Sequence, residues 1–364
     1  MSFKQTIGML LATLFFSGCA EAQKKSTNME IVHPTDPNIQ YIGRIEFSDS
    51  LFPTFTYPGV QIRTGFTGTS LDMTCKLHSG YFMAEIDGGE PFKISFLGNT
   101  VVNLARDLED GTHQAVVTYI GEGYENVPEF HGFFVEKGKT LAPATPLPTR
   151  KIEFIGNSIT CGYGIEAKSE AEHYSEKTAN YYYTYAARTA RNLNAQALVV
   201  ARSGIGVYRS YNGPQTGDAV NMNTEYPYTL LYNDKYKWDF TRYTPDVVCI
   251  NLGTNDTSTQ GADSLLLLKG FKQLYHQVRS HYSKAKIVLL CGCMMTGEQL
   301  RSAQHALNTT ADYAHQQGDA EVYRFDFTPH DGSLGYGADW HPSMKQHEKM
   351  ANELTNYLKT LMNW

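Results

Sequence analysis

The stretch VVCINLGTND at residues 247–256 decides the fold class, because a continuous apolar run ends directly in polar residues. Such a run, without alternation, is typical of a strand in a parallel sheet covered on both faces. Four similar runs follow Arg150, with helical patterns between them. The predicted strands are 152–155, 197–201, 247–251, 287–290 and 322–325, and the predicted helices are 180–193, 263–282, 298–317 and 343–362. We therefore predict a three-layer α/β/α domain with a central parallel sheet over residues 150–364.

The preceding part of the chain has a different rhythm. Residues 31–140 contain short apolar stretches broken by turn residues, and no helical period persists there. Asp87-Gly88-Gly89 and Asp110-Gly111 are typical of hairpin turns. We predict an all-β sandwich of jelly-roll type over residues 31–140. The three prolines of residues 141–149 predict a stiff linker between the two domains.

The charge balance of the chain argues against a nucleic-acid partner. The chain of 364 residues carries 31 Lys and Arg against 37 Asp and Glu, a net charge of −6. With no basic surplus to neutralise phosphates, we predict no nucleic-acid partner. The pair Cys291 and Cys293 ends a predicted strand, so we interpret it as buried core rather than a metal site. No metal or cofactor is predicted.

The first thirty residues are predicted to be a leader and tether outside the fold. An apolar run over residues 7–16 is too short to span a bilayer but suits a secretion signal. The run ends in Ser17-Gly18-Cys19, which resembles a bacterial lipobox, although Phe16 replaces the usual aliphatic residue. We therefore predict an exported lipoprotein, lipidated at Cys19, in the periplasm or on the cell surface. Its contact with the membrane would be this lipid alone. Ordinary signal-peptidase cleavage near Ala22 is the alternative.

Four polar motifs lie where active sites of α/β domains are found, near the carboxyl ends of the predicted strands. Three follow predicted strands directly: GNSIT at 156–160, RSGIG at 202–206 and NLGTND at 251–256. The fourth, DWHPS at 339–343, opens the last predicted helix. Ligands bind outside the carboxyl ends of parallel strands, so we expect the motifs to meet there. Each motif alone also suits a helix cap or a turn.

The residue types in these motifs suit acyl transfer by a serine. The Ser158 hydroxyl needs a base, for which His341 is the candidate. Gly204 and Asn255 are candidates for donating hydrogen bonds to an oxyanion. Asp339 is a candidate for orienting the imidazole. A base at the ordinary histidine pKa of about 6.5 would make activity rise with pH near that value.

Together the motifs resemble the signature blocks of the SGNH hydrolase superfamily. Two further features make the chain similar to carbohydrate esterase family 2. One is the sandwich ahead of these motifs, and the other is a set of stretches in the second domain: Trp238-Asp-Phe, residues 244–256 and residues 339–343. This resemblance implies that Ser158 is the nucleophile, His341 the base, and Gly204 and Asn255 the oxyanion-hole residues. It also implies a carboxylic ester hydrolase that removes acetyl groups from hemicellulose sugars of xylan or glucomannan.

Two positions depart from the usual SGNH pattern. Asn157 replaces the aspartate of the first block. The position three residues before the histidine is Ala338, and Asp339 lies two before. Asp339 could therefore orient His341, a backbone carbonyl could do so instead, or Asp339 could cap the last helix.

Aromatic side chains near these motifs are candidates for contacting a sugar. Trp340 and Trp238 offer indole faces on which a pyranose ring could stack, although Trp238 suits a core position equally well. Tyr163 and residues 165–179 follow the nucleophile motif and could form a rim. The predicted partner is an acetylated carbohydrate. The alternatives are an esterase on another acetylated glycan, such as peptidoglycan, and a glycan-binding lipoprotein without catalysis.

Overall fold

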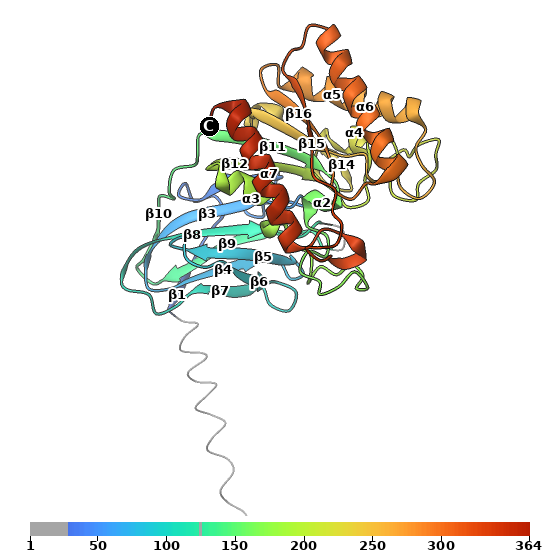
Figure 1. Cartoon of the computed structure of the whole chain (residues 1–364). Helices are drawn as coiled ribbons and strands as arrows, with labels where there is room; N and C mark the ends of the chain where they lie inside the picture. The colour runs from blue at the N-terminus through green and yellow to red at the C-terminus, as the bar shows by residue number, and fades with distance from the viewer. Residues whose placement is uncertain (1–27, 124–125) are drawn as a thin grey trace, which may run out of the picture.

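The computed structural model describes residues 28–123 and 126–364, and it has two parts (Figure 1). The first part, called the sandwich below, contains two antiparallel sheets. One sheet has the order β1-β9-β4-β7 and the other β10-β3-β8-β5-β6, with β2 paired to β3. The strands are β1 Met29–Val32, β2 Gln40–Ile42, β3 Gln61–Gly68, β4 Leu71–Cys75, β5 Tyr81–Ile86, β6 Phe92–Ser95, β7 Val101–Ala105, β8 Gly111–Tyr119, β9 Phe130–Glu136 and β10 Leu141–Ala142.

Turn signals in the sandwich are borne out at one position and not at the other. Asp87 and Gly88 adopt φ values of 54° and 68° between the paired strands β5 and β6, as a hairpin turn requires. The hairpin predicted at Asp110-Gly111 is wrong, because β7 pairs with β4 and β8 pairs with β3 and β5. The chain crosses between the two sheets there, which a local turn motif cannot reveal.

The second part, called the α/β domain below, is built on a five-stranded parallel sheet of order β12-β11-β15-β16-β17. Its strands are β11 Arg150–Gly156, β12 Ala195–Ala201, β15 Val247–Asn251, β16 Lys286–Cys291 and β17 Val322–Asp326. The main helices are α3 Tyr185–Asn192, α5 Ser264–His281, α6 Gly297–Gln316 and α7 Met344–Met362. The predicted fold class, a β-sandwich followed by a three-layer α/β/α domain, is confirmed.

Alternating residues of each strand supply the two cores of the α/β domain. On β15, Val248 and Ile250 pack with α5 and α6, while Val247 and Cys249 pack with α3 and α7. A strand buried on both faces needs apolar residues at every position, which explains the unbroken run at 247–250. The predicted helix over 180–193 divides at Thr184, whose extended backbone lets its side chain cap α3.

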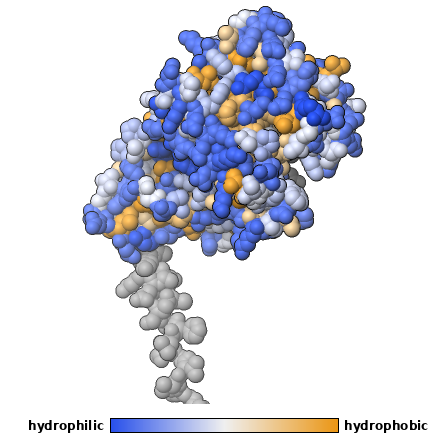
Figure 2. All heavy atoms as spheres, viewed as in Figure 1, coloured by the Kyte–Doolittle hydropathy of each residue, from blue (hydrophilic) through white to orange (hydrophobic). Residues whose placement is uncertain are grey.

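Smaller elements complete the α/β domain. They include the hairpin strands β13 Tyr228–Leu230 and β14 Asn233–Lys237 and the short helices α2 Ser158–Cys161, α4 Met222–Glu225, η1 Tyr181–Tyr183, η2 Phe240–Arg242 and η3 Ala338–Trp340. Within the described residues, no helix is both long and apolar enough to cross a membrane. The face seen in Figure 2 is mostly hydrophilic, with apolar residues in small patches.

The sandwich and the α/β domain share packed side chains. Met83 and Ile120 of the sandwich are buried in the core around α3 and α7, and Tyr57 is buried in the core around α5 and α6. The buried guanidinium of Arg44 lies 3.3 Å from the carboxylate of Glu153 on β11. The sandwich therefore serves as one wall of the α/β domain.

Candidate active site

The carboxyl ends of the three central strands meet at one edge of the sheet. Gly156 at the end of β11 is in register with Ala201 of β12 and with Asn251 of β15. The loops after these strands therefore start side by side. They carry the three predicted motifs that begin with GNSIT, RSGIG and NLGTND.

Ser158 is held by a tight turn between β11 and α2. Asn157 caps α2, and its side chain accepts a hydrogen bond from Ile159 N at 3.1 Å. Ser158 is the first residue of the helix and is 6% exposed. An amide oxygen caps a helix as well as a carboxylate does, so the Asn157 departure preserves the local structure.

His341 lies beside Ser158 although 183 positions separate them. Its Nε2 is 2.8 Å from Ser158 Oγ. Its Nδ1 lies 3.1 Å from the carbonyl oxygen of Ala338 and 3.2 Å from that of Asp339. Carbonyl oxygens can only accept, so Nδ1 carries the proton and Nε2 is free to accept the serine proton. The pair has the geometry of a nucleophile and its general base.

Strained backbone brings these carbonyl groups to the imidazole. Asp339 and Trp340 are consecutive non-glycine residues in the left-handed region, with φ values of 48° and 64°. The loop is fastened to the segment after the nucleophile by a hydrogen bond from Ala338 N to Gly164 O at 3.0 Å. A Cβ on Gly164 would lie 2.3 Å from the Ala338 Cβ, so only glycine permits this approach.

The Asp339 carboxylate does not contact the imidazole. One oxygen accepts a hydrogen bond from the Tyr163 hydroxyl at 2.7 Å, and the other lies 2.8 Å from His173 Nδ1. Burial raises the pKa of Asp339, but these hydrogen bonds outweigh burial and hold the pKa below its usual value. The prediction that this carboxylate orients His341 is therefore wrong, and the backbone-carbonyl alternative describes the geometry. The capping alternative also fails, because Ser343 caps α7.

The surroundings of His341 keep its imidazole neutral. The Tyr163 ring stacks on it, with ring centroids 4.1 Å apart. Burial lowers the pKa of His341 to about 4, although the carbonyl oxygens of Ala338 and Asp339 oppose this shift. Above about pH 4 the ring is therefore ready to accept a proton.

Gly204 and Asn255 line the same pocket as Ser158 and His341, and the pocket has a volume of about 480 Å³. Gly204 adopts a φ of 77°. The side-chain amide of Asn255 donates a hydrogen bond to Ile205 O at 2.7 Å, which joins the loop after β15 to the loop after β12. The structure thus brings both candidate oxyanion donors to the pocket that holds the Ser158 hydroxyl.

Asp256 holds the loop after β12 against the loop after β15, a role that no sequence motif indicates. Its buried carboxylate accepts hydrogen bonds from the backbone N–H groups of Val207, Tyr208 and Arg209 at 2.9–3.2 Å. A Cβ on Gly206 would lie 2.5 Å from this carboxylate, so glycine allows the loop to close around it. In the sequence, Asp256 is indistinguishable from a turn residue.

Aromatic side chains surround the pocket unevenly. Trp340 is 58% exposed, and Tyr163 lines the pocket. Tyr211, which carries no motif in the sequence, also lines the pocket and is 56% exposed. Trp238 is not brought to the site. It is 5% exposed and lies under the Arg44 guanidinium, so the predicted stacking of Trp238 on a sugar is wrong and the core alternative holds.

Two other sequence predictions concern cysteine and metals. Cys19 lies outside the described residues. The five cysteines within residues 28–123 and 126–364 are buried and unpaired. In the same described part of the chain, no three His, Cys, Asp or Glu side chains are grouped closely enough to hold a metal ion.

The chain is similar to known protein families and to several characterised proteins. Residues 41–145 match the carbohydrate esterase 2 N-terminal family, and residues 154–349 match the GDSL-like lipase/acylhydrolase family. A cellulase/esterase of Acetivibrio thermocellus, CelE, is 40% identical over 90% of this chain, which spans 40% of that protein's length. An acetylxylan esterase/glucomannan deacetylase of Cellvibrio japonicus is 29% identical over 98% of both chains.

A solved structure extends this similarity to three dimensions. It is a family two carbohydrate esterase from Clostridium thermocellum in complex with cellohexaose, at 39% identity and a TM-score of 0.83. The match covers 90% of this chain and 99% of that one. The similarity therefore includes both the sandwich and the α/β domain.

Proposed function

Because the chain belongs to carbohydrate esterase family 2, we propose that it is a serine esterase that removes O-acetyl groups from plant cell-wall polysaccharide or oligosaccharide, such as xylan and glucomannan. The family resemblance stated from the sequence motifs is confirmed. The observation that carries the proposed activity is the 2.8 Å contact between Ser158 Oγ and His341 Nε2. The name of the Cellvibrio relative and the bound cellohexaose of the Clostridium structure support the substrate class.

The first half of the reaction transfers the acetyl group to the enzyme. Ser158 Oγ attacks the acetyl carbonyl carbon while its proton passes to Nε2 of His341. The imidazolium that forms is stabilised through Nδ1 by the carbonyl oxygens of Ala338 and Asp339. His341 then protonates the departing sugar oxygen, and the acetyl group remains on Ser158.

The oxyanion of the tetrahedral intermediate needs donors that are already in place. The backbone N–H groups of Ser158 and Gly204 and the side-chain amide of Asn255 supply them in our proposal. Losing one such donor in a preorganised site costs about 2.7–4 kcal/mol of transition-state stabilisation. In the second half of the reaction, water takes the place of the sugar and attacks the acetyl carbon while His341 removes a proton from it. His341 then returns this proton to Ser158 Oγ as the bond between Oγ and the acetyl carbon breaks, and acetate leaves.

The sugar that carries the acetyl group would lie at the open side of the pocket. Trp340 is exposed next to His341 and offers an apolar face to a pyranose ring. Tyr163 lines the pocket with its ring stacked on the imidazole. We assign substrate contact to both side chains.

The test is acetate release from acetylated xylan, acetylated glucomannan and O-acetylated peptidoglycan. Wild type should release acetate from the plant polysaccharides, and Ser158→Ala should reduce the rate by at least about 10⁴-fold while remaining folded. Ser280→Ala is the matched control, because Ser280 is exposed on α5 and its hydroxyl donates only to Gln277 O. Full activity in Ser158→Ala would refute the nucleophile, and release from peptidoglycan alone would refute the substrate class.

We also propose that the enzyme works outside the cytoplasm as a lipoprotein, since a polysaccharide cannot cross the membrane to reach it. The lipobox-like Ser17-Gly18-Cys19 supports this proposal. Wild type produced in a bacterium should incorporate labelled fatty acid and sediment with membranes. Cys19→Ala should do neither, and labelling that persists in this variant would refute lipidation at Cys19.

A further inference from the structure

Glu122 reaches from the sandwich into the α/β domain next to the candidate oxyanion donors. It follows β8 and is 5% exposed. Its carboxylate accepts hydrogen bonds from both the backbone N–H and the hydroxyl of Ser203, at 2.6 and 2.5 Å. Ser203 immediately precedes Gly204. A carboxylate contributed by the sandwich therefore holds the residue that leads into Gly204.

The same carboxylate contacts the segment that carries the nucleophile. The Cys161 thiol is a polar neighbour of Glu122, and each of the two side chains shifts the pKa of the other. Cys161 is the last residue of α2, and Ser158 is its first. Glu122 thus joins the helix of the nucleophile to the loop of the oxyanion donor, although it belongs to neither.

The loop that carries Glu122 is fixed on both sides. Ile120 is buried in the core around α3 and α7, and its carbonyl oxygen accepts a hydrogen bond from Tyr181 N at 3.1 Å. Gly123 N donates to Thr56 O at 2.9 Å, and a Cβ on Gly123 would lie 2.5 Å from the Thr56 side chain. Glu122 is therefore held at a set distance from Ser203.

Burying this carboxylate is unfavourable by itself. Burial raises the pKa of Glu122, and the hydrogen bonds from Ser203 and the neighbouring Cys161 thiol only partly offset the effect. A hydrophobic side chain would fill the same interface without that cost. A carboxylate at position 122 has two acceptor oxygens, so it can bind the backbone N–H and the hydroxyl of Ser203 at the same time.

We propose that Glu122 is a positioning residue that sets the orientation of the Ser203–Gly204 peptide for oxyanion binding. The proposal rests on the proposed esterase function. Holding Ser203 by its N–H and its hydroxyl fixes the Cα of Ser203, from which the peptide group with the Gly204 N–H continues. An oxyanion donor displaced by about 1 Å loses much of its effect on the rate.

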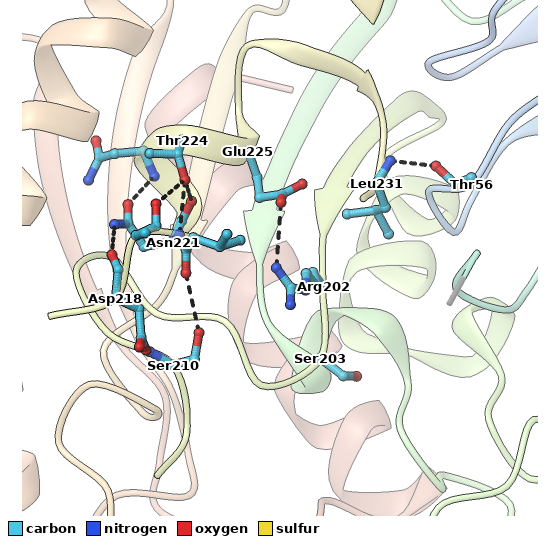
Figure 3. Close-up of polar contacts among 12 residues, drawn as sticks. Thr56, Arg202, Ser203, Ser210, Asp218, Asn221, Thr224, Glu225 and Leu231 are labelled. Atoms are coloured by element: carbon cyan, nitrogen blue, oxygen red, sulfur yellow. Dashed lines mark hydrogen bonds and ion pairs between the residues drawn. The ribbon is translucent and has the colours of Figure 1, made fainter. Parts of the chain in front are cut away.

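Three variants of Glu122 separate the effect of side-chain length from the effect of the negative charge. Glu122→Ala removes both acceptors, and Glu122→Asp keeps the charge but is one methylene too short. Glu122→Gln keeps the reach, with an oxygen for the Ser203 N–H and an amide that can donate to the hydroxyl. The control Thr56→Val leaves the Thr56 carbonyl oxygen that binds Gly123 N and breaks a different contact of this interface, the 2.7 Å hydrogen bond from Leu231 N to Thr56 Oγ1 (Figure 3).

Two kinetic measurements read the oxyanion site without requiring the natural substrate. With p-nitrophenyl acetate, Glu122→Ala and Glu122→Asp should lower kcat about 10- to 100-fold and change KM by less than about threefold. Glu122→Gln should stay within about fivefold of wild type. The reaction of Ser158 with a p-nitrophenyl alkylphosphonate, whose phosphoryl oxygen occupies the oxyanion site, should slow by the same factors. Thr56→Val should lower Tm but keep kcat within about twofold.

The outcomes distinguish this inference from the proposed function. Glu122→Asp keeps a buried charge, so it can be tested even if the alanine variant fails to fold. Unchanged kcat and an unchanged rate of phosphonylation in Glu122→Asp would overturn the positioning role. An equal loss of kcat in Thr56→Val would overturn it too, because any damage to the interface would then suffice. If wild type releases no acetate from any polysaccharide while phosphonylation still slows in Glu122→Asp, the substrate proposal fails and the positioning role stands.

Discussion

Replacing Asp339 by Asn tests whether backbone carbonyl groups alone orient the imidazole of His341, the proposed general base. The carboxylate of Asp339 binds Tyr163 and His173, while His341 Nδ1 faces the carbonyl oxygens of residues 338 and 339. Asn can accept the hydrogen bond from His173 and can donate to the Tyr163 hydroxyl. It also tolerates the left-handed φ of 48° at this position. The substitution therefore removes one negative charge and leaves the backbone in place.

The size of the expected loss follows from these contacts. Only the electrostatic attraction between Asp339 and the imidazolium is lost, because no hydrogen bond joins the carboxylate to the ring. We expect kcat/KM to fall by less than about tenfold, or about 1.4 kcal/mol. When a carboxylate directly orients the histidine, its conversion to an amide costs about 10⁴-fold, or about 5 kcal/mol.

The assay is hydrolysis of p-nitrophenyl acetate and of acetylated xylan oligosaccharides by Asp339→Asn. Asp331→Asn is the matched control, because Asp331 is an exposed aspartate that bonds only to Ser333 among the described contacts. His341→Ala sets the scale of a full loss. A fall near 10⁴-fold in Asp339→Asn, with an unchanged Tm, would refute the role given to the backbone carbonyl groups.

Three further results are expected. Burial lowers the pKa of His341 to about 4, so kcat/KM should fall only below about pH 4 and stay constant from about pH 5 to 8. A fall of kcat/KM that begins near pH 6.5, as the sequence alone predicts, would contradict this. Asn255→Ala should lower kcat about 10²- to 10³-fold with little change in KM, and a change in KM alone would argue against oxyanion binding. Burial lowers the pKa of His347 to about 3, so the unfolded chain binds more protons below about pH 6.5. The free energy of unfolding should therefore fall as pH drops from 6.5 to 4, by up to about 1.4 kcal/mol per pH unit for this group, and His347→Gln should flatten that slope in denaturant titrations.

The order of elements could be predicted from the sequence because each depends on residues close together in the chain. The unbroken apolar run at 247–250 predicts a parallel strand covered on both faces, and the structure has β15 at 247–251. Parallel strands end at a common edge, so the polar residues after them were expected to meet. Ser158, Gly204, Asn255 and His341 do line one pocket.

The orientation of side chains within the site could not be predicted in this way. Asp339 is two residues from His341 in the chain, yet its carboxylate turns away because the backbone at 339 and 340 is left-handed. The exposure of an indole likewise depends on what packs against it, so Trp238 is buried under Arg44 while Trp340 is open to solvent. Neither conformation has a signature in the local sequence.

By itself, then, the sequence determined the two folding units, the edge of the sheet where the proposed active site lies, and the serine and histidine that meet there. These follow from periodicity and from residue types, which act over a few positions. Only the tertiary structure decided which group orients His341 and how far the pKa of His341 falls. It also decided that Glu122 of the sandwich accepts hydrogen bonds from Ser203. Those features arise from burial and from contacts between segments far apart in the chain, and their energies depend on distances that no local pattern encodes.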